Sequence, residues 1–308
     1  MRKYMKFKKF DIVEDYSDHY YSKSKSSSGQ PPINWAKKIQ DEWRILERNL
    51  PDLIFVRVYE GRMDLLRAVI IGVDGTPYSD GLFFFDICFP KNYPKDPPQV
   101  YYHSGGLRIN PNLYANGTVC LSLLNTWRGN RDEKWSPAIS TMLQVLVSIQ
   151  GMILNAKPYF NEPGYEALSG SVNGEAHSLQ YNQQILITSL KTMVYTIKKP
   201  PKNFEDLVIG HFRDRATGIV TKCKDYYMKG MGDKYSIDVR DKTGYSLKLR
   251  KEVKAYMKTL VAAFKHIGGV YDDLDDYVPL DNENNTDNAL QKKKKNIIQK
   301  ILPCFDFE

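Results

Sequence analysis

Cysteine is scarce in this chain of 308 residues, and no two cysteines form a C-x-x-C pair. No histidine stands at zinc-ligand spacing from any of them, so the sequence gives no sign of a metal site. Isolated cysteines favour free thiols in a reducing compartment, and the cytoplasm or the nucleus is the expected location. The four are Cys88, Cys120, Cys223 and Cys304.

Long hydrophobic runs are missing as well. No apolar stretch approaches the ~18–20 residues that a membrane span needs. The N-terminus, M-R-K-Y-M-K-F-K-K-F, is basic but lacks the apolar segment of a secretory signal. The formal net charge is +8, yet the positive residues are spread along the chain and accompany no recognised nucleic-acid motif. We expect neither a membrane span nor nucleic-acid binding.

One cysteine stands in an unusual setting. Cys120 ends the loop N-P-N-L-Y-A-N-G-T-V-C, which is rich in turn formers and follows a strand-like run. Taken alone, it fits both a nucleophile and a buried, inert thiol. The neighbouring turns fix the backbone around it, and Asn112 supplies an amide that can face developing oxyanion charge. This setting favours the nucleophile.

The remaining pattern predicts an α+β fold. A helix begins after Asn34 and ends before Pro51. Runs of β-favouring residues follow, and their short links suit an antiparallel meander. A proline-rich loop over 90–98 interrupts them. The four expected strands cover 54–59, 65–73, 82–89 and 99–103.

Helical patterns dominate after the cysteine. Ser136 and Pro137 predict a helix start, with Ser136 as N-cap, and its apolar face reaches about residue 154. Further helices are expected over 175–199, after Asn203, and over 245–267. The predicted organisation is a basic flexible arm over 1–33, a core over 34–200, a helical extension over 201–270 and a charged tail over 271–308.

Four sequence motifs resemble the ubiquitin-conjugating enzymes over about 34–200. T-P-Y-S-D-G-L-F-F-F-D-I matches the family's turn and strand, and F-P-K-N-Y-P-K-D-P-P-Q-V matches its proline loop. N-G-T-V-C-L-S-L-L and W-S-P-A match the cysteine segment and the next helix start. The segments W-A-K-K-I-Q and K-P-Y-F-N-E-P-G-Y resemble the large-enzyme branch, which includes plant phosphate-response and giant hybrid enzymes.

The resemblance implies an N-terminal helix, a four-stranded antiparallel meander, an active-site loop and further helices. It also implies that Cys120 accepts ubiquitin as a thioester from the activating enzyme, which consumes ATP, and passes it to lysines. No bound cofactor is expected. The implied partners are ubiquitin, the activating enzyme, a ubiquitin ligase and a protein substrate. The implied site residues are Asn112 for catalysis, Glu162 or Asn161 as an acidic or polar gate, Lys95, Ser136, Pro137 and Ala138 for ligase contact, and Lys37 and Lys38 for activating-enzyme contact.

Three departures from the family pattern stand out. Asn110 replaces the usual histidine before Pro111, and we expect its loss to spare activity. Lys95 stands where a large apolar residue often serves RING-type ligases. The stretch between Leu124 and Trp135 is longer than in the minimal enzymes, and it is either a plain surface loop or a lid that places the acceptor lysine.

Two alternative functions stay open on the sequence. One is conjugation of another ubiquitin-like modifier. The other is a non-catalytic ubiquitin-binding module of the same fold, which Cys120 and Asn112 at family spacing argue against. Papain-like proteolysis is not expected, because no local histidine signature accompanies Cys120.

Overall fold

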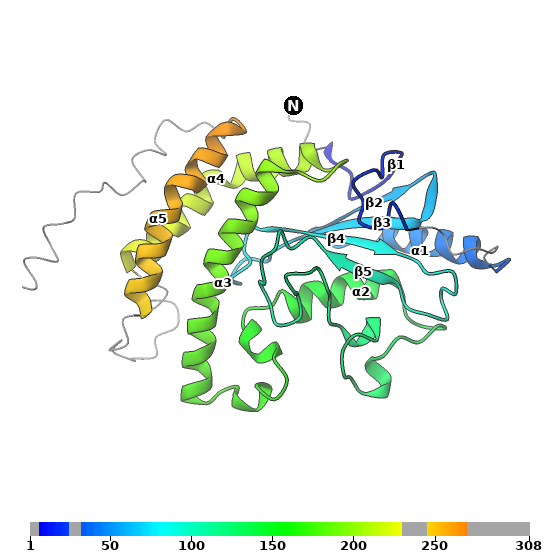
Figure 1. The fold of residues 1–308 in the computed structure, drawn as a ribbon, viewed down its shortest axis with the longest axis horizontal. Helices are drawn as coiled ribbons and strands as arrows, with labels where there is room; N and C mark the ends of the chain where they lie inside the picture. Colours follow the sequence, from blue (N-terminus) through cyan, green and yellow to red (C-terminus); the bar gives the residue numbers. More distant parts are fainter. Residues whose placement is uncertain (1–5, 25–31, 230–244, 270–308) are drawn as a thin grey trace, which may run out of the picture.

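The computed structural model describes residues 6–24, 32–229 and 245–269. Its centre is a five-stranded mixed sheet in the order β1-β2-β3-β4-β5 (Figure 1). The strands are β1 (Phe10–Val13), β2 (Ile54–Tyr59), β3 (Arg62–Ile71), β4 (Leu82–Cys88) and β5 (Gln99–Tyr102). Strands β2 to β5 pair antiparallel, which confirms the predicted meander.

The fifth strand is β1, which pairs parallel to β2 and comes from the predicted flexible arm. That interpretation of the arm is wrong for residues 6–24. The arm lies against the sheet because a buried ion pair of Arg67 with Asp86, whose Nε–Oδ1 distance is 2.6 Å, offers it polar partners. Asp18 accepts from Nη1 of Arg67 at 2.8 Å, and the Tyr20 N–H donates to Asp86 at 2.7 Å.

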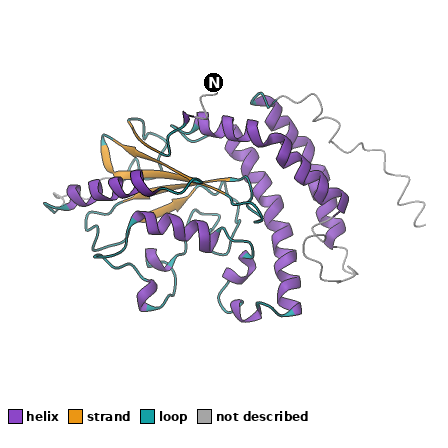
Figure 2. Ribbon diagram, turned by 180° about the vertical axis from the view of Figure 1, so that it is seen from behind, coloured by secondary structure: helices purple, strands orange, loops and turns teal. Residues whose placement is uncertain are grey.

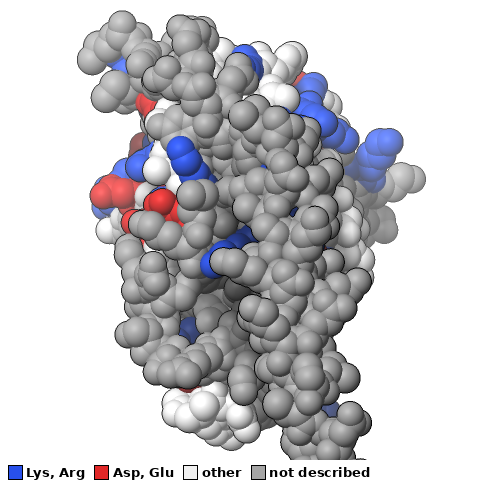
Figure 3. Space-filling model, turned by 90° about the vertical axis from the view of Figure 1, so that its left-hand side faces the viewer, with Lys and Arg blue, Asp and Glu red and all other residues white. Residues whose placement is uncertain are grey.

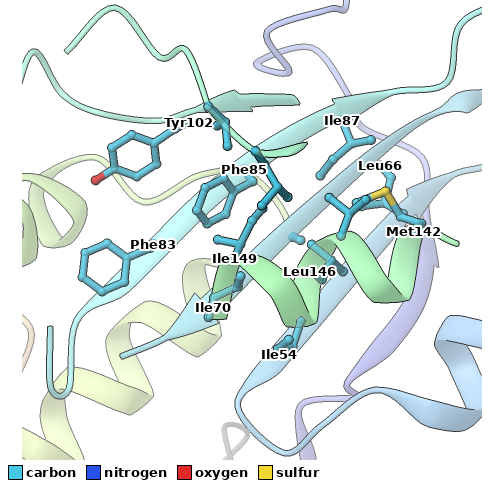
Figure 4. Close-up of a cluster of buried hydrophobic side chains, with 14 of the residues drawn as sticks. Ile54, Leu66, Ile70, Phe83, Phe85, Ile87, Tyr102, Met142, Leu146 and Ile149 are labelled. Atoms are coloured by element: carbon cyan, nitrogen blue, oxygen red, sulfur yellow. The ribbon is translucent and has the colours of Figure 1, made fainter. Parts of the chain in front are cut away.

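Two helices cover one face of the sheet (Figure 2). They are α1 (Trp35–Asn49) and α2 (Met142–Ser148), which continues as one π-helical segment, η4 (Ile149–Ile153). In Figure 4, Met142, Leu146 and Ile149 point from the helix toward the strands. Their partners alternate along each strand, so that every second residue enters this core. Those labelled are Ile54, Leu66, Ile70, Phe83, Phe85, Ile87 and Tyr102.

The start of α2 differs from the sequence prediction. The helix begins at Met142, not after Ser136, because Thr141 and Gln144 form a capping box. The Thr141 hydroxyl accepts the Gln144 N–H at 3.3 Å, and the Gln144 side chain accepts the Thr141 N–H at 3.0 Å. Residues 136–140 instead form a turn, closed by the Ser140 N–H donating to the Ser136 carbonyl. Ile139, predicted to lie on the apolar face, is 72% exposed.

Residues of the opposite sheet face share a second core with three long helices. These are α3 (Val172–Lys198), α4 (Glu205–Lys229) and α5 (Tyr245–His266). Val69, Ile71 and Phe84 enter this second core, where the Phe84 and Phe204 ring centroids lie 5.3 Å apart. The predicted helical extension therefore shares a core with the sheet. The predicted charged tail over 271–308 lies outside the described residues.

Charges of both signs meet on the side of the molecule that carries α4 and α5 (Figure 3). Lys222 on α4 contacts Asp74 and Asp80 of the turn before β4, at 2.9 Å in each case. Lys248 on α5 lies 3.7 Å from Glu252. Part of the positive charge of these helices is therefore neutralised within the chain.

Candidate active site

Cys120 lies at the end of a loop that closes on itself. The Cys120 N–H donates to the Asn112 carbonyl at 2.9 Å. In return, Nδ2 of Asn112 donates to the Cys120 carbonyl at 3.0 Å. Both residues are buried to 8% exposure, so these bonds are shielded from water. The two residues that the sequence singled out are thus held together by two reciprocal hydrogen bonds.

Asn110 anchors this loop to the rest of the fold. Its Nδ2 donates to the Tyr78 hydroxyl and to the Ile153 carbonyl, at 2.7 Å in each case. Its Oδ1 accepts the Asn112 N–H at 2.8 Å. Asn110 is fully buried and makes these three bonds where most of the family has histidine. An amide therefore supports the loop at this position.

The environment of Cys120 sets its acidity. Burial raises the pKa of the Cys120 thiol, while the positive charge of Arg108 and a hydrogen bond from the Tyr114 hydroxyl act in the opposite direction. Burial raises the pKa of Cys88 and of Cys223 to about 12, with Asp64 adding to the effect at Cys88. A cation opposes this effect at each of the three thiols, since Arg62 acts on Cys88 and Lys222 on Cys223. Cys120 is therefore set apart by its closed loop and not by a neighbouring cation.

The two gate candidates have different surroundings. Asn161 belongs to η5 (Pro158–Asn161), where its Oδ1 accepts from Asn155 at 2.8 Å and its Nδ2 donates to the Ile153 carbonyl. Its side chain therefore holds the backbone of its own segment. Oε2 of Glu162 lies 3.9 Å from Nη2 of Arg108. Only Glu162 of the two thus contacts the group that acts on Cys120.

The two predicted ligase-contact loops lie together. Nε1 of Trp135 donates to the Pro94 carbonyl at 2.7 Å, and the Trp135 ring lies 5.6 Å from that of Tyr93. This links the segment of Lys95 to the segment of Ser136, Pro137 and Ala138. Lys95, Pro137 and Ala138 are exposed, and Ser136 is half-buried. The four residues therefore belong to one joined surface region, as a single binding site requires.

The predicted activating-enzyme contacts, Lys37 and Lys38, lie on α1. Lys37 is exposed, while Nζ of Lys38 lies 3.4 Å from Oε1 of Glu42. Glu42 is a fully buried carboxylate that the sequence analysis missed. It accepts from the Tyr93 hydroxyl at 2.7 Å and from the Met142 N–H at 2.9 Å. It thus ties α1 both to the proline loop and to the start of α2.

Arg108 and Tyr114 were also not identified from the sequence as neighbours that act on Cys120. Tyr114 lies within the cysteine loop and Arg108 two residues before it, so their nearness to Cys120 in sequence was the available signal. Neither residue type by itself indicates a role beside a thiol. Among the described residues, no cluster of His, Cys, Asp and Glu could hold a metal ion. No helix in the described ranges combines the length and apolar character of a membrane span.

A buried cysteine in a closed loop is compatible with thiol-based acyl transfer. Comparison with known proteins agrees: the sequence profile of the family "Ubiquitin-conjugating enzyme" matches residues 38–185. "Putative ubiquitin-conjugating enzyme E2 38" of Arabidopsis thaliana is 52% identical over 94% of this chain and 90% of its own length. This chain belongs to the ubiquitin-conjugating enzyme family.

Other relatives are longer. "Probable ubiquitin-conjugating enzyme E2 25" of Arabidopsis thaliana is 59% identical over 84% of this chain, which spans 43% of that protein. Human "Dual E2 ubiquitin-conjugating enzyme/E3 ubiquitin-protein ligase BIRC6" is 38% identical over 73% of this chain and 5% of its own length. These matches confirm the resemblance to the large-enzyme branch. The solved structure of human ubiquitin-conjugating enzyme E2 G1 is 27% identical, covers 39% of this chain and 94% of its own, and has a TM-score of 0.34.

Proposed function

We propose that Cys120 carries ubiquitin as a thioester and passes it to lysine side chains. The observation that carries this proposal is the closed loop in which Asn112 and Cys120 exchange two hydrogen bonds. The ubiquitin arrives from the activating enzyme, which consumes the ATP, and Lys37 with the exposed part of α1 contacts that enzyme. The joined loops of Lys95 and Pro137 contact a ubiquitin ligase.

In the loading step, the thiolate of Cys120 attacks the thioester carbonyl of ubiquitin on the activating enzyme. The carbon–sulfur bond there breaks, and the cysteine of the activating enzyme leaves as a thiolate. In the transfer step, a lysine amine attacks the new thioester, and the sulfur of Cys120 leaves. A thiolate suits both steps near neutral pH, because it is both a good nucleophile and a good leaving group.

Asn112 serves the transfer step through the loop. Its Nδ2 fixes the carbonyl of Cys120, so the nucleophile keeps one backbone position while its acyl group is exchanged. Reactive thiols need a reducing compartment, and the free Cys88 and Cys223 fit the same requirement. We therefore propose the cytoplasm or the nucleus as its location.

A loading assay tests the assignment. Ubiquitin, activating enzyme and ATP should yield a reducible adduct with the whole chain, and none with Cys120→Ala. Cys120→Ser should give an adduct that resists reducing agents, because an alkoxide leaves less readily than a thiolate. Cys88→Ala is the matched control and should load normally, since that thiol is half-buried with a pKa of about 12.

An adduct that persists in Cys120→Ala, or that disappears in Cys88→Ala, would overturn the assignment of the nucleophile. Repeating the assay with other ubiquitin-like modifiers and their activating enzymes identifies the modifier. Loading with one of those and not with ubiquitin would replace the proposed function by the conjugation of that modifier. No adduct with any modifier would leave a binding module of the same fold.

A further inference from the structure

The N-terminal arm places an aromatic ring on the last strand of the sheet. The ring of Tyr20 lies parallel to that of Tyr101 on β5, with the ring centroids 3.6 Å apart and an angle of 5° between the planes. Tyr20 is 55% exposed, and its backbone N–H donates to the buried Asp86 at 2.7 Å. The backbone of the arm is therefore anchored at Asp86 independently of the Tyr20 ring, whose contact is with Tyr101.

The ring of Tyr101 also lies against the cysteine loop. Gly117 approaches this ring so closely that a Cβ atom on the glycine would lie 2.0 Å from Cε2 of Tyr101. The backbone joins the same two segments, because the Tyr102 N–H donates to the Gly117 carbonyl at 2.8 Å and Tyr101 forms a β-bridge with Thr118. Tyr101 thus contacts the arm through one neighbour and the cysteine loop through another.

The cysteine loop is a short hairpin with Gly117 near its tip. Residues 112–114 pair antiparallel with residues 118–120 through one β-bridge and two backbone hydrogen bonds, of 3.0 and 2.9 Å. Asn112 and Cys120 lie side by side at the open end of this hairpin. Because paired strands move together, a displacement at Gly117 is carried to both of these residues.

We propose that Tyr20 is a positioning residue for the transfer step: its ring holds Tyr101 against Gly117 and so keeps the hairpin in the orientation that transfer requires. Without the ring of Tyr20, one face of the Tyr101 ring would meet water, and the ring could turn away from Gly117 to another rotamer. This inference rests on the proposed function and extends its site to the N-terminal arm. Tyr20 lies outside residues 38–185, which the family profile matches.

Transfer depends on orientation more than loading does. In transfer, the acceptor amine, the thioester carbonyl and the amide of Asn112 must be aligned, whereas loading needs an accessible sulfur. Tyr20→Ala should therefore lower the maximal rate of discharge to lysine by about 3–10-fold, a small part of the ~10²-fold that a misplacement of 1 Å can cost. The rate of loading and the lysine concentration for half-maximal discharge should stay unchanged.

Two variants separate positioning from plain support of the fold. Tyr20→Phe keeps the ring and should discharge like the wild type. Tyr16→Ala is the matched control, because Tyr16 is a tyrosine of the same arm whose ring meets that of Tyr59 on β2 at 6.0 Å, edge to face. It loses an aromatic contact of the arm without touching Tyr101, and it should also discharge like the wild type.

A double variant tests whether Tyr20 acts through the hairpin. If it does, Tyr20→Ala should slow discharge less in the background of Asn112→Ala than in the wild type, because both substitutions disturb one unit. Amide hydrogen exchange gives a second measurement that needs no activity. The N–H groups of Tyr102 and Cys120, which donate to the Gly117 and Asn112 carbonyls, should exchange faster in Tyr20→Ala and at the wild-type rate in Tyr16→Ala.

The experiment forms the thioester on the whole chain, at a temperature where thermal melts show each variant folded, and follows its discharge to free lysine at increasing concentrations. Slower maximal discharge and faster amide exchange in Tyr20→Ala, with neither change in Tyr20→Phe or Tyr16→Ala, support the proposal. Wild-type discharge or unchanged amide exchange in Tyr20→Ala, equal slowing in Tyr16→Ala, or effects of Tyr20→Ala and Asn112→Ala that multiply in full overturn it. Failure of the wild type to form an adduct on Cys120 would instead overturn the proposed function.

Discussion

Replacing Asn112 by alanine removes the side chain that joins the two ends of the Cys120 loop. The lost amide–carbonyl bond of 3.0 Å is worth about 0.5–1.5 kcal/mol, and the buried Cys120 carbonyl is left without that partner at a cost of about 1–3 kcal/mol. Loading should be nearly normal, because the sulfur stays available for attack. Transfer to lysine should be at least tenfold slower, since about 1.4 kcal/mol of that loss is enough when it falls on the transition state.

The assay follows the discharge of the preformed thioester to free lysine in a single turnover. Asn116→Ala is the matched control, because Asn116 is an exposed asparagine of the same loop that accepts the Thr118 N–H at 3.1 Å. It should discharge within about twofold of the wild type, as surface substitutions usually leave the energy within ~0.5 kcal/mol. Equal rates for Asn112→Ala and the wild type would refute a role of this amide in transfer.

Three further predictions follow from other parts of the molecule. If the stretch between Leu124 and Trp135 is a lid that places the acceptor lysine, Asp132→Ala with Glu133→Ala should slow discharge onto lysine but not thioester formation. High salt should weaken this effect. Discharge rates that stay unchanged at low and at high salt would show that the stretch is a plain surface loop. Glu42→Met should lower the free energy of unfolding by about 2–3 kcal/mol in a thermal melt, because the Tyr93 hydroxyl and the Met142 N–H both donate to this carboxylate and the thioether leaves both without an oxygen acceptor; a loss under about 1 kcal/mol contradicts this. Burial lowers the pKa of His19 and of His211, so the unfolded state binds more protons than the folded state in acid. The free energy of unfolding should therefore fall as the pH drops below about 6.5. His19→Gln and His211→Gln should each flatten this decline, and an equally steep decline in both variants would contradict the role of the two histidines.

The sequence predicted best what depends on neighbouring residues. Alternating and continuous apolar runs predicted β2 to β5 to within a few residues, because the apolar positions of a strand follow from which of its faces are buried. The cysteine loop was equally clear, because its turn residues and Asn112 lie within ten positions of Cys120. The capping box at Thr141 is also a local signal, but Ser136 and Pro137 indicated an earlier helix start, so the predicted helix began too early.

Contacts between distant residues could not be predicted. Glu42 sits in a helical pattern as an ordinary charged residue, and its partners Tyr93 and Met142 lie 51 and 100 positions away. Strand β1 is four residues long and has polar flanks, so its pairing with β2 leaves little trace in composition. The pairing of Arg108 with Glu162 likewise brings together residues 54 positions apart, 162 minus 108.

The second face of the sheet shares a core with the three long helices, which limits where the chain can be cut to make a folded fragment. The family profile spans residues 38–185 and omits β1, the rest of the arm, and most of the three long helices. Phe84 and Val69 are buried against those omitted parts, and the ion pair of Arg67 with Asp86 loses its arm contacts without them. A fragment trimmed to the profile would expose an apolar sheet surface and should aggregate. Chimaeras between relatives must therefore exchange the arm, the core and the helices as one block.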